Sequence, residues 1–181
     1  MTWAVWITGL PGSGKTAVAQ RTRSVLEASG ISALKVLELD EIRKFITPKP
    51  TYSEEEREIV YAALVYMAKL LVDSGTPVII DATANRRRYR ERARMVIPKF
   101  AEVYITCPLE TCMRRERRRK AEHAPPGIYQ KADEEEATVP GVNVPYEAPL
   151  HPEVVVDSER MSVEESAEKV ATFVLTRLIS E

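Results

Sequence analysis

Short apolar runs alternate along the chain with longer amphipathic segments. The runs favour β-branched and aromatic residues, which is typical of strands. The run Pro77-Val-Ile-Ile-Asp81 is apolar until its last carboxylate, as expected for a parallel strand buried on both faces. Strands are predicted at residues 3–8, 33–39, 77–81, 102–106 and 153–157.

Helical spacing of apolar residues follows these runs. Ser53 with Glu56, and Ser162 with Glu165, have the Ser-x-x-Glu spacing of a capping box, which opens a helix. Asn85 is expected to cap an arginine-rich helix that ends before Pro98. Helices are predicted at residues 15–28, 53–74, 109–121, and after residues 85 and 162.

The alternation of strands and helices predicts an α/β protein built in three layers. We expect a five-stranded, mostly parallel sheet with helices on both faces, in a single domain over residues 1–181. Ligands of such folds bind at the carboxyl ends of the strands. The functional residues are therefore sought where the predicted strands end.

Periodicity disappears between residues 123 and 152, where prolines cluster. A loop of this length inside a compact domain is usually functional or disordered. We expect a lid, bounded at about residues 114–150, that is mobile when the site is empty and closes over the substrate.

Composition limits the partners of the chain. Hydrophobic residues make up 44% and charged residues 29%, and the formal net charge is −1, so bulk charge indicates no nucleic-acid partner. The apolar runs are far shorter than a membrane span, and the N-terminus lacks the pattern of a signal peptide. We expect a cytoplasmic protein without a membrane partner. Cys107 and Cys112 are interpreted as free thiols.

A phosphate-binding motif follows the first predicted strand. The stretch Gly9-Leu-Pro-Gly-Ser-Gly-Lys-Thr16 matches the P-loop pattern, with a strand before it and a helix after it. Lys15 is expected to bridge the β- and γ-phosphates of ATP as a catalytic cation, and Thr16 to ligate Mg²⁺. The residues predicted to bind ATP here are Gly9, Leu10, Pro11, Gly12, Ser13, Gly14, Lys15 and Thr16.

The class of P-loop protein depends on the rest of the chain. No Asn/Thr-Lys-x-Asp stretch for guanine is present, which argues against a GTPase. The size of the chain and its arginine-rich helix near the fourth strand favour a small-molecule kinase with a lid that excludes water. The expected fold is thus P-loop kinase-like, with ATP and Mg²⁺ as cofactors.

Carboxylates end two of the predicted strands. Asp40 follows the second strand and Asp81 ends the third, so both are expected near the P-loop. One could help hold Mg²⁺, and one could accept the proton of an attacking hydroxyl. Either residue could instead cap the turn that follows it.

Basic residues are concentrated at residues 86–94 and 114–120. Nucleic-acid binding is one interpretation; phosphate or sulfate clamping by a few arginines, with the others on the surface, is another. Arg114 and Arg118, which share a helical face, are candidates to contact ATP, and Arg87 is a candidate for the acceptor.

Several stretches, taken in order, resemble adenylyl-sulfate kinases. They include Leu39-Asp-Glu-Ile-Arg43, Tyr52-Ser-Glu-Glu-Glu-Arg57 and the P-loop with its strand. The most specific are Tyr129-x-Lys131-Ala and Pro145-Tyr-Glu-Ala-Pro149, followed by the last strand, which look like the substrate lid of that family.

This resemblance implies transfer of the ATP γ-phosphoryl group to the 3′-hydroxyl of adenylyl sulfate, a step of sulfate assimilation. It places Asp40 near Mg²⁺ and the acceptor hydroxyl as a catalytic residue. By the same resemblance, Arg43 and Arg57 contact the acceptor nucleotide, Tyr52 stacks on adenine, and Lys131 is the lid lysine that closes over the acceptor with residues 145–149.

The chain departs from the family pattern in its acceptor half. Val60, Ala62-Ala63 and Val139 replace an asparagine, an arginine pair and a phenylalanine, and Asp81-Ala-Thr-Ala-Asn85 is similar to small kinases with an Asp-Ala-Thr-Asn turn. The alternatives are therefore a kinase acting on a nucleoside, a sugar or a nucleic-acid end, and a nucleotide-regulated nucleic-acid-binding protein. A homodimer is left open.

Overall fold

The computed structural model describes residues 2–118, 127–133 and 137–179. In this part of the chain one sheet of five parallel strands has the order β2-β3-β1-β4-β5, which confirms the predicted α/β fold. The strands are β1 (Ala4–Thr8), β2 (Lys35–Glu38), β3 (Val78–Asp81), β4 (Phe100–Thr106) and β5 (Val154–Asp157).

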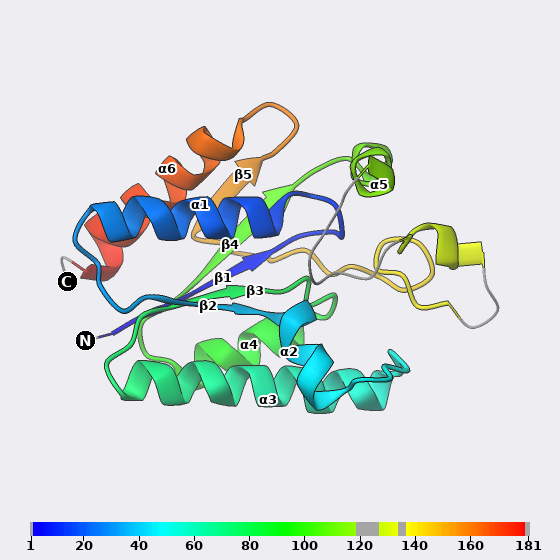
Figure 1. Cartoon of the computed structure of the whole chain (residues 1–181), viewed down its shortest axis with the longest axis horizontal. Helices are drawn as coiled ribbons and strands as arrows, with labels where there is room; N and C mark the ends of the chain where they lie inside the picture. Colours follow the sequence, from blue (N-terminus) through cyan, green and yellow to red (C-terminus); the bar gives the residue numbers. More distant parts are fainter. Residues whose placement is uncertain (1, 119–126, 134–136, 180–181) are drawn as a thin grey trace.

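Helices cover both faces of this sheet (Figure 1). They are α1 (Lys15–Ala28), α2 (Leu39–Ile46), α3 (Glu54–Asp73), α4 (Arg87–Val96), α5 (Leu109–Arg118) and α6 (Val163–Phe173), with a 3₁₀ turn η1 (Gln130–Asp133) and a π-helical end η2 (Val174–Ile179). None of the helices in the described part is long and apolar enough to cross a membrane.

The central strand β1 explains the three layers. Its alternate residues Val5 and Ile7 belong to one buried cluster with α1 and α6. Ala4 and Trp6 point the other way, into a second buried cluster with α3 and α4. Because successive side chains of a strand point to opposite faces, an all-apolar strand needs a helical layer on each side.

Helix α2 is absent from the sequence prediction, which ended the second strand just before Asp40. The strand ends at Glu38, and Asp40 lies in the first turn of α2. The Leu-x-Leu alternation at residues 37–39 looks like a strand. Leu39 and Arg43 are nevertheless both buried and four residues apart, which is the spacing of one helical face.

The helix starts follow the predicted caps in two places of three. Ser162 and Glu165 form a complete capping box. Ser53 accepts a hydrogen bond from the Glu56 N–H at 3.2 Å, but the Glu56 carboxylate accepts from the Thr51 and Tyr52 N–H groups. The Asn85 cap is wrong: Arg86 is the N-cap of α4 and makes no side-chain cap bond.

The expected lid extends from the edge of the sheet at which the strands end (Figure 1, yellow). It contains η1 and a bridge between Pro140 and Val144. Residues 119–126 and 134–136 of the expected lid lie outside the described residues. The P-loop meets this same edge of the sheet, because it connects β1 to α1.

Candidate active site

The P-loop wraps tightly at the N-terminus of α1. Gly12 and Gly14 have φ angles of 79° and 101°, in the left-handed region that favours glycine. A Cβ at Gly12 would lie 2.5 Å from the backbone oxygen of Cys112, so a side chain cannot fit there. The Lys15 Nζ donates to the Leu10 backbone oxygen at 3.0 Å. Backbone N–H groups at a helix N-terminus make a phosphate cradle.

A cavity of about 300 Å³ adjoins this loop. It collects residues that are distant in the sequence: the start of α1, the start of α2, the loop before α3, the end of β3 and the lid. The predicted site residues that line it are Pro11, Lys15, Thr16, Asp40, Arg43, Tyr52, Arg57, Asp81 and Lys131. Tyr61, Ile128 and residues 137–140 complete much of its wall.

Both predicted carboxylates face this cavity. Asp81 is 4% exposed, and its Oδ2 accepts a hydrogen bond from the Thr16 hydroxyl at 2.6 Å. This contact follows from the pairing of β1 and β3, which puts Asp81 opposite Ile7. Asp40 reaches the cavity from the first turn of α2. The two carboxylates and the hydroxyl are oxygen ligands of the kind that Mg²⁺ prefers.

No group of three or more His, Cys, Asp or Glu side chains is arranged to hold a metal ion within the described residues. The donor set on the chain side is thus the Thr16 hydroxyl with two aspartates at the P-loop. Such a set suits a cation that also binds phosphate oxygens, as Mg²⁺ does in nucleotide sites.

Arg43 and Tyr52 form one wall of the cavity. The Arg43 guanidinium lies 4.9 Å from the centre of the Tyr52 ring and pairs with the Glu56 carboxylate at 2.7 Å. Burial raises the pKa of Tyr52, although Arg43 lowers it. Tyr52 has a φ of 56°, which is uncommon for a bulky residue and points to a constrained position.

Arg57 is 6% exposed and lines the same cavity. Its Nε donates to the Tyr52 backbone oxygen at 3.0 Å and its Nη1 to the Asn85 Oδ1 at 3.0 Å. Its Nη2 donates to the backbone oxygen and hydroxyl of Thr138, at 2.7 and 3.1 Å. Arg57 therefore joins the loop before α3, the β3–α4 turn and the lid.

Three predicted contacts lie away from the cavity. Arg87 is not among the residues that line it, because its Nε donates to the Ala148 backbone oxygen at 2.8 Å and its N–H donates to Glu147. Arg114 and Arg118 are exposed on α5, and as ATP contacts they stay predictions.

Arg115, which sequence reasoning missed, lies beside the P-loop. Its Nη1 donates to the Ser158 hydroxyl at 3.0 Å and approaches the Ser13 backbone oxygen at 3.5 Å. The signal was available: Arg115 is three residues after Cys112 and next to Glu116, and both of these are buried on the inner face of α5.

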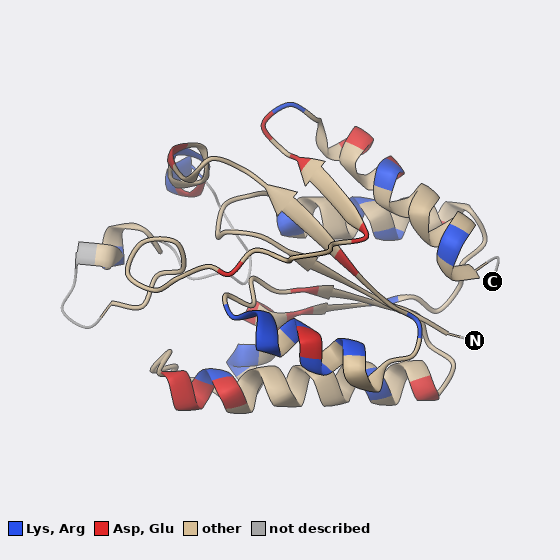
Figure 2. Ribbon diagram, turned by 180° about the vertical axis from the view of Figure 1, so that it is seen from behind, with Lys and Arg blue, Asp and Glu red and all other residues tan. Residues whose placement is uncertain are grey.

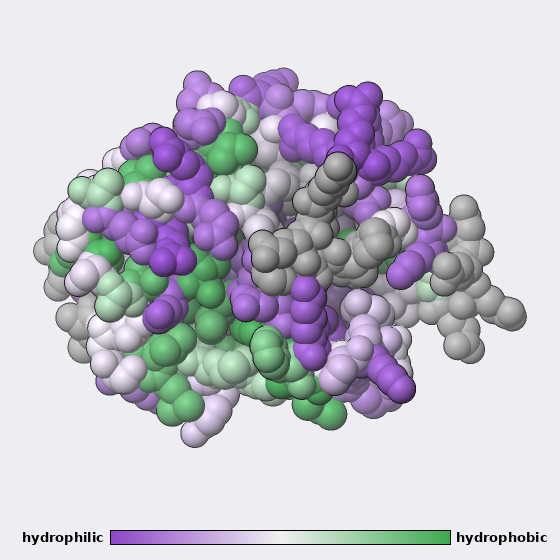
Figure 3. All heavy atoms as spheres, in the orientation of Figure 1, coloured by the Kyte–Doolittle hydropathy of each residue, from purple (hydrophilic) through white to green (hydrophobic). Residues whose placement is uncertain are grey.

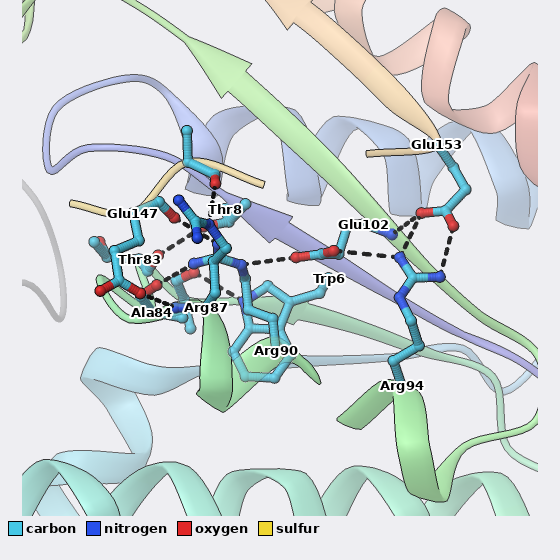
Figure 4. Close-up of polar contacts among 12 residues, drawn as sticks. Trp6, Thr8, Thr83, Ala84, Arg87, Arg90, Arg94, Glu102, Glu147 and Glu153 are labelled. Carbon is cyan, nitrogen blue, oxygen red and sulfur yellow. Dashed lines mark hydrogen bonds and ion pairs between the residues drawn. The ribbon is translucent and has the colours of Figure 1, made fainter. Parts of the chain in front are cut away.

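Residues 145–149 are hydrogen-bonded to the body of the protein, as Figure 4 shows for Glu147, and their closure over the acceptor stays a prediction. The Tyr146 and Thr8 hydroxyls are hydrogen-bonded at 3.0 Å, and the Glu147 N–H donates to the Asn85 backbone oxygen at 2.8 Å. Arg90 donates to the Glu147 backbone oxygen at 2.6 Å. The residues of the expected lid that line the cavity are Ile128, Lys131 and residues 137–140.

Known proteins share this architecture. A family model described as adenylylsulphate kinase matches residues 1–157, which include every cavity-lining residue named above. A probable adenylyl-sulfate kinase from Pyrococcus abyssi is 38% identical over 169 residues, which are 93% of this chain and 92% of that protein. The protein of the same name from Archaeoglobus fulgidus is 38% identical over 161 residues, covering 88% of this chain and 98% of that one.

A solved structure gives a similar result. The Mycobacterium tuberculosis APS kinase CysC, in complex with AMPPNP and APS, is 32% identical in sequence with a TM-score of 0.83. The likeness covers 97% of this chain and 98% of that chain. The similarity therefore extends over the sheet, the P-loop and the cavity together.

Proposed function

The chain belongs to the adenylylsulphate kinase family, and we propose that it transfers the γ-phosphoryl group of ATP to the 3′-hydroxyl of adenylyl sulfate. The observation that carries this function is the single cavity that joins Lys15 and Thr16 of the P-loop to Arg43, Tyr52 and Arg57. A phosphate donor and a nucleotide acceptor can meet in this space, and the similar Mycobacterium tuberculosis protein is in complex with AMPPNP and APS.

The ATP half of the site rests on the P-loop. Its backbone N–H groups would surround the β-phosphate, and Lys15 would turn from the Leu10 oxygen toward the γ-phosphate. There its charge stabilises the negative charge that spreads over the transferring group. Because the reaction uses ATP, we place the enzyme in the cytoplasm.

The Thr16 hydroxyl, Asp81 and Asp40 would hold Mg²⁺ together with phosphate oxygens. The cation, when bound, neutralises the phosphate charge. The Thr16 hydroxyl donates a hydrogen bond to Asp81, which leaves its lone pairs directed away from Asp81 and available to a cation.

The acceptor half supplies cations, a ring and a base. Arg43, Arg57 and Lys131 provide positive charge for the phosphosulfate group, and the Tyr52 ring provides a surface for the adenine. Asp40 would take the proton of the 3′-hydroxyl as that oxygen attacks the γ-phosphorus. Ile128 and residues 137–140 line the cavity and would exclude water from it.

A panel of acceptors tests this function. The purified chain, ATP and Mg²⁺ are mixed with adenylyl sulfate, a nucleoside, a sugar acid or an oligonucleotide with a free 5′-hydroxyl, and ADP release is followed. We expect turnover with adenylyl sulfate and a product whose new phosphate is on the ribose 3′-oxygen. Turnover on another acceptor, with adenylyl sulfate inert, would refute the proposal.

A second copy of the chain is the proposed protein partner. Ile59, Tyr66 and Leu70 are 70%, 60% and 50% exposed on the outer face of α3, and Phe45 of α2 is 80% exposed. Figure 3 shows hydrophobic surface along this edge of the molecule. Sedimentation should give a dimer that Tyr66→Glu dissociates, whereas a monomeric wild-type chain would refute the assembly.

A further inference from the structure

Arg57, one of the cations that line the cavity, is held without a carboxylate partner among the described residues. Arg57 makes four hydrogen bonds, all to uncharged oxygens of Tyr52, Asn85 and Thr138. The structure shows no ion pair of Arg57 within the described residues. Burial lowers the pKa of Arg57, and Arg43 lowers it further, but a guanidinium keeps its proton in proteins. A buried positive charge is therefore retained beside the cavity.

The other cavity arginine provides the contrast. Arg43 pairs with the Glu56 carboxylate at 2.7 Å, so part of its charge is already balanced. An anion that enters the cavity would gain more from Arg57, since no carboxylate of the described residues forms an ion pair with it, although Glu54 raises its pKa from a greater distance.

Asn85 is the residue that makes this arrangement work. It is 2% exposed, and its Oδ1 accepts from Arg57 while its Nδ2 donates to the Pro145 backbone oxygen at 3.3 Å. Only an amide offers an acceptor on one side and a donor on the other in this shape. An aspartate would keep the bond to Arg57, add a negative charge, and lose the bond to Pro145.

We propose that Asn85 is a positioning residue that holds Arg57 as an unbalanced cation for the anionic group of the acceptor. The inference rests on the proposed function. It assigns a role to the Asp-Ala-Thr-Ala-Asn turn, which is similar in sequence to that of other small kinases. Asn85 of this turn was expected to be a helix cap. Through its hydrogen bond to Pro145, Asn85 also connects Arg57 to residues 145–149.

The test compares Asn85→Asp with Asn85→Ala in steady-state kinetics and thermal unfolding. We expect Asn85→Asp to raise the KM for adenylyl sulfate about 30-fold or more, with the KM for ATP changed less than about 2-fold. Asn85→Ala should raise it less. The unfolding temperature should fall more in Asn85→Ala than in Asn85→Asp. The introduced carboxylate would pair with Arg57, whereas the alanine leaves polar groups unsatisfied.

The matched control is the same substitution at the chain's other asparagine, Asn143, which is exposed and bonded to Val139 and Ala132. Asn143→Asp should leave both KM values within about 2-fold of wild type. A structural role for Asn85 predicts that alanine impairs acceptor binding at least as much as aspartate, and that result would overturn the inference. A wild-type enzyme inactive on adenylyl sulfate would instead refute the proposed function, and the inference with it.

Discussion

Arginines in two regions of this protein lie in opposite electrostatic surroundings. Helix α4 is rich in arginine, but glutamates surround it. Figure 2 shows basic positions on α4 and acidic positions at the start of α3. Arg88 pairs with Glu54 and Glu58. Arg94 pairs with Glu102 and Glu153 (Figure 4). Arg90, at 1% exposure, pairs with Glu102 at 2.7 Å.

The cavity has the opposite arrangement, with an arginine that has no ion pair among the described residues. Arg57 is a single arginine in a stretch of glutamates, yet its partners in the described structure are uncharged oxygens. The density of positive charge along the sequence therefore does not locate the anion site. What distinguishes the two regions is whether carboxylates from other elements reach the guanidinium groups.

The comparison also removes one of the two basic stretches on which the nucleic-acid interpretation rested. For residues 86–94, that interpretation needed arginines that are available to phosphates. Glutamates of α3 and β4, with Glu147 and Glu153, already neutralise this helix. The basic stretch holds the body of the protein and residues 145–149 together.

The largest expected effect lies in the cavity region. Lys15→Ala should lower kcat about 10³-fold, because the charge that meets the transferring phosphoryl group is lost. The free energy of unfolding should hardly change, since Lys15 lies at the cavity and not in the core. Single-turnover kinetics and urea unfolding measure the two quantities. Near-normal turnover in the variant would contradict the P-loop assignment.

Arg90→Met tests the α4 region by the opposite readout. It removes one of the two arginine partners of the buried Glu102 and the donors to the Ala84 and Glu147 backbone oxygens. We expect the free energy of unfolding to fall by about 3 kcal/mol, measured by urea denaturation. A stability equal to wild type would contradict the claim that the ion pairs of α4 stabilise the fold.

The two cavity carboxylates should separate by role. Asp40→Asn should lower kcat about 10²-fold even at saturating Mg²⁺, because the base is lost together with one proposed Mg²⁺ ligand. Asp81→Asn should raise the Mg²⁺ concentration for half-maximal rate, because Asp81 orients the Thr16 hydroxyl. Magnesium titrations of both variants check this. Identical profiles would show that the two aspartates share one role.

The smallest effect is expected for an exposed arginine of α4. Arg88 has a side chain 48% exposed, with two glutamate partners. Arg88→Ala should cost less than about 1 kcal/mol of stability, because exposed ion pairs contribute little. Its KM values should equal those of wild type. A raised KM for adenylyl sulfate in this variant would contradict the claim that the arginines of α4 do not contribute to acceptor binding.

The sequence predicts the sheet and the P-loop well because their signals are local. Strand periodicity, the glycine pattern and the Ser162 capping box each depend on residues within one turn or one strand. The resemblance to adenylyl-sulfate kinases added Arg43, Tyr52, Arg57 and Lys131, and all four line the cavity.

What the sequence did not predict depends on contacts between distant segments. Asn85 looked like a helix cap, but its partners Arg57 and Pro145 come from elsewhere in the chain. Nothing local in the sequence shows that Arg87 donates to Ala148 and Glu147, and as a substrate contact it stays a prediction. A polar side chain forms hydrogen bonds with the groups that the fold brings close to it. These partners cannot be predicted from the spacing of residues along the sequence.

The central claim is that the unbalanced cation of the cavity, and not the arginine-rich helix, binds the anionic acceptor. The most direct measurement is the KM for adenylyl sulfate of Arg57→Gln, with the KM for ATP measured on the same sample. The account predicts a rise of about 100-fold for adenylyl sulfate and less than about 2-fold for ATP. An unchanged KM for adenylyl sulfate, in a variant that remains folded and active, would contradict it.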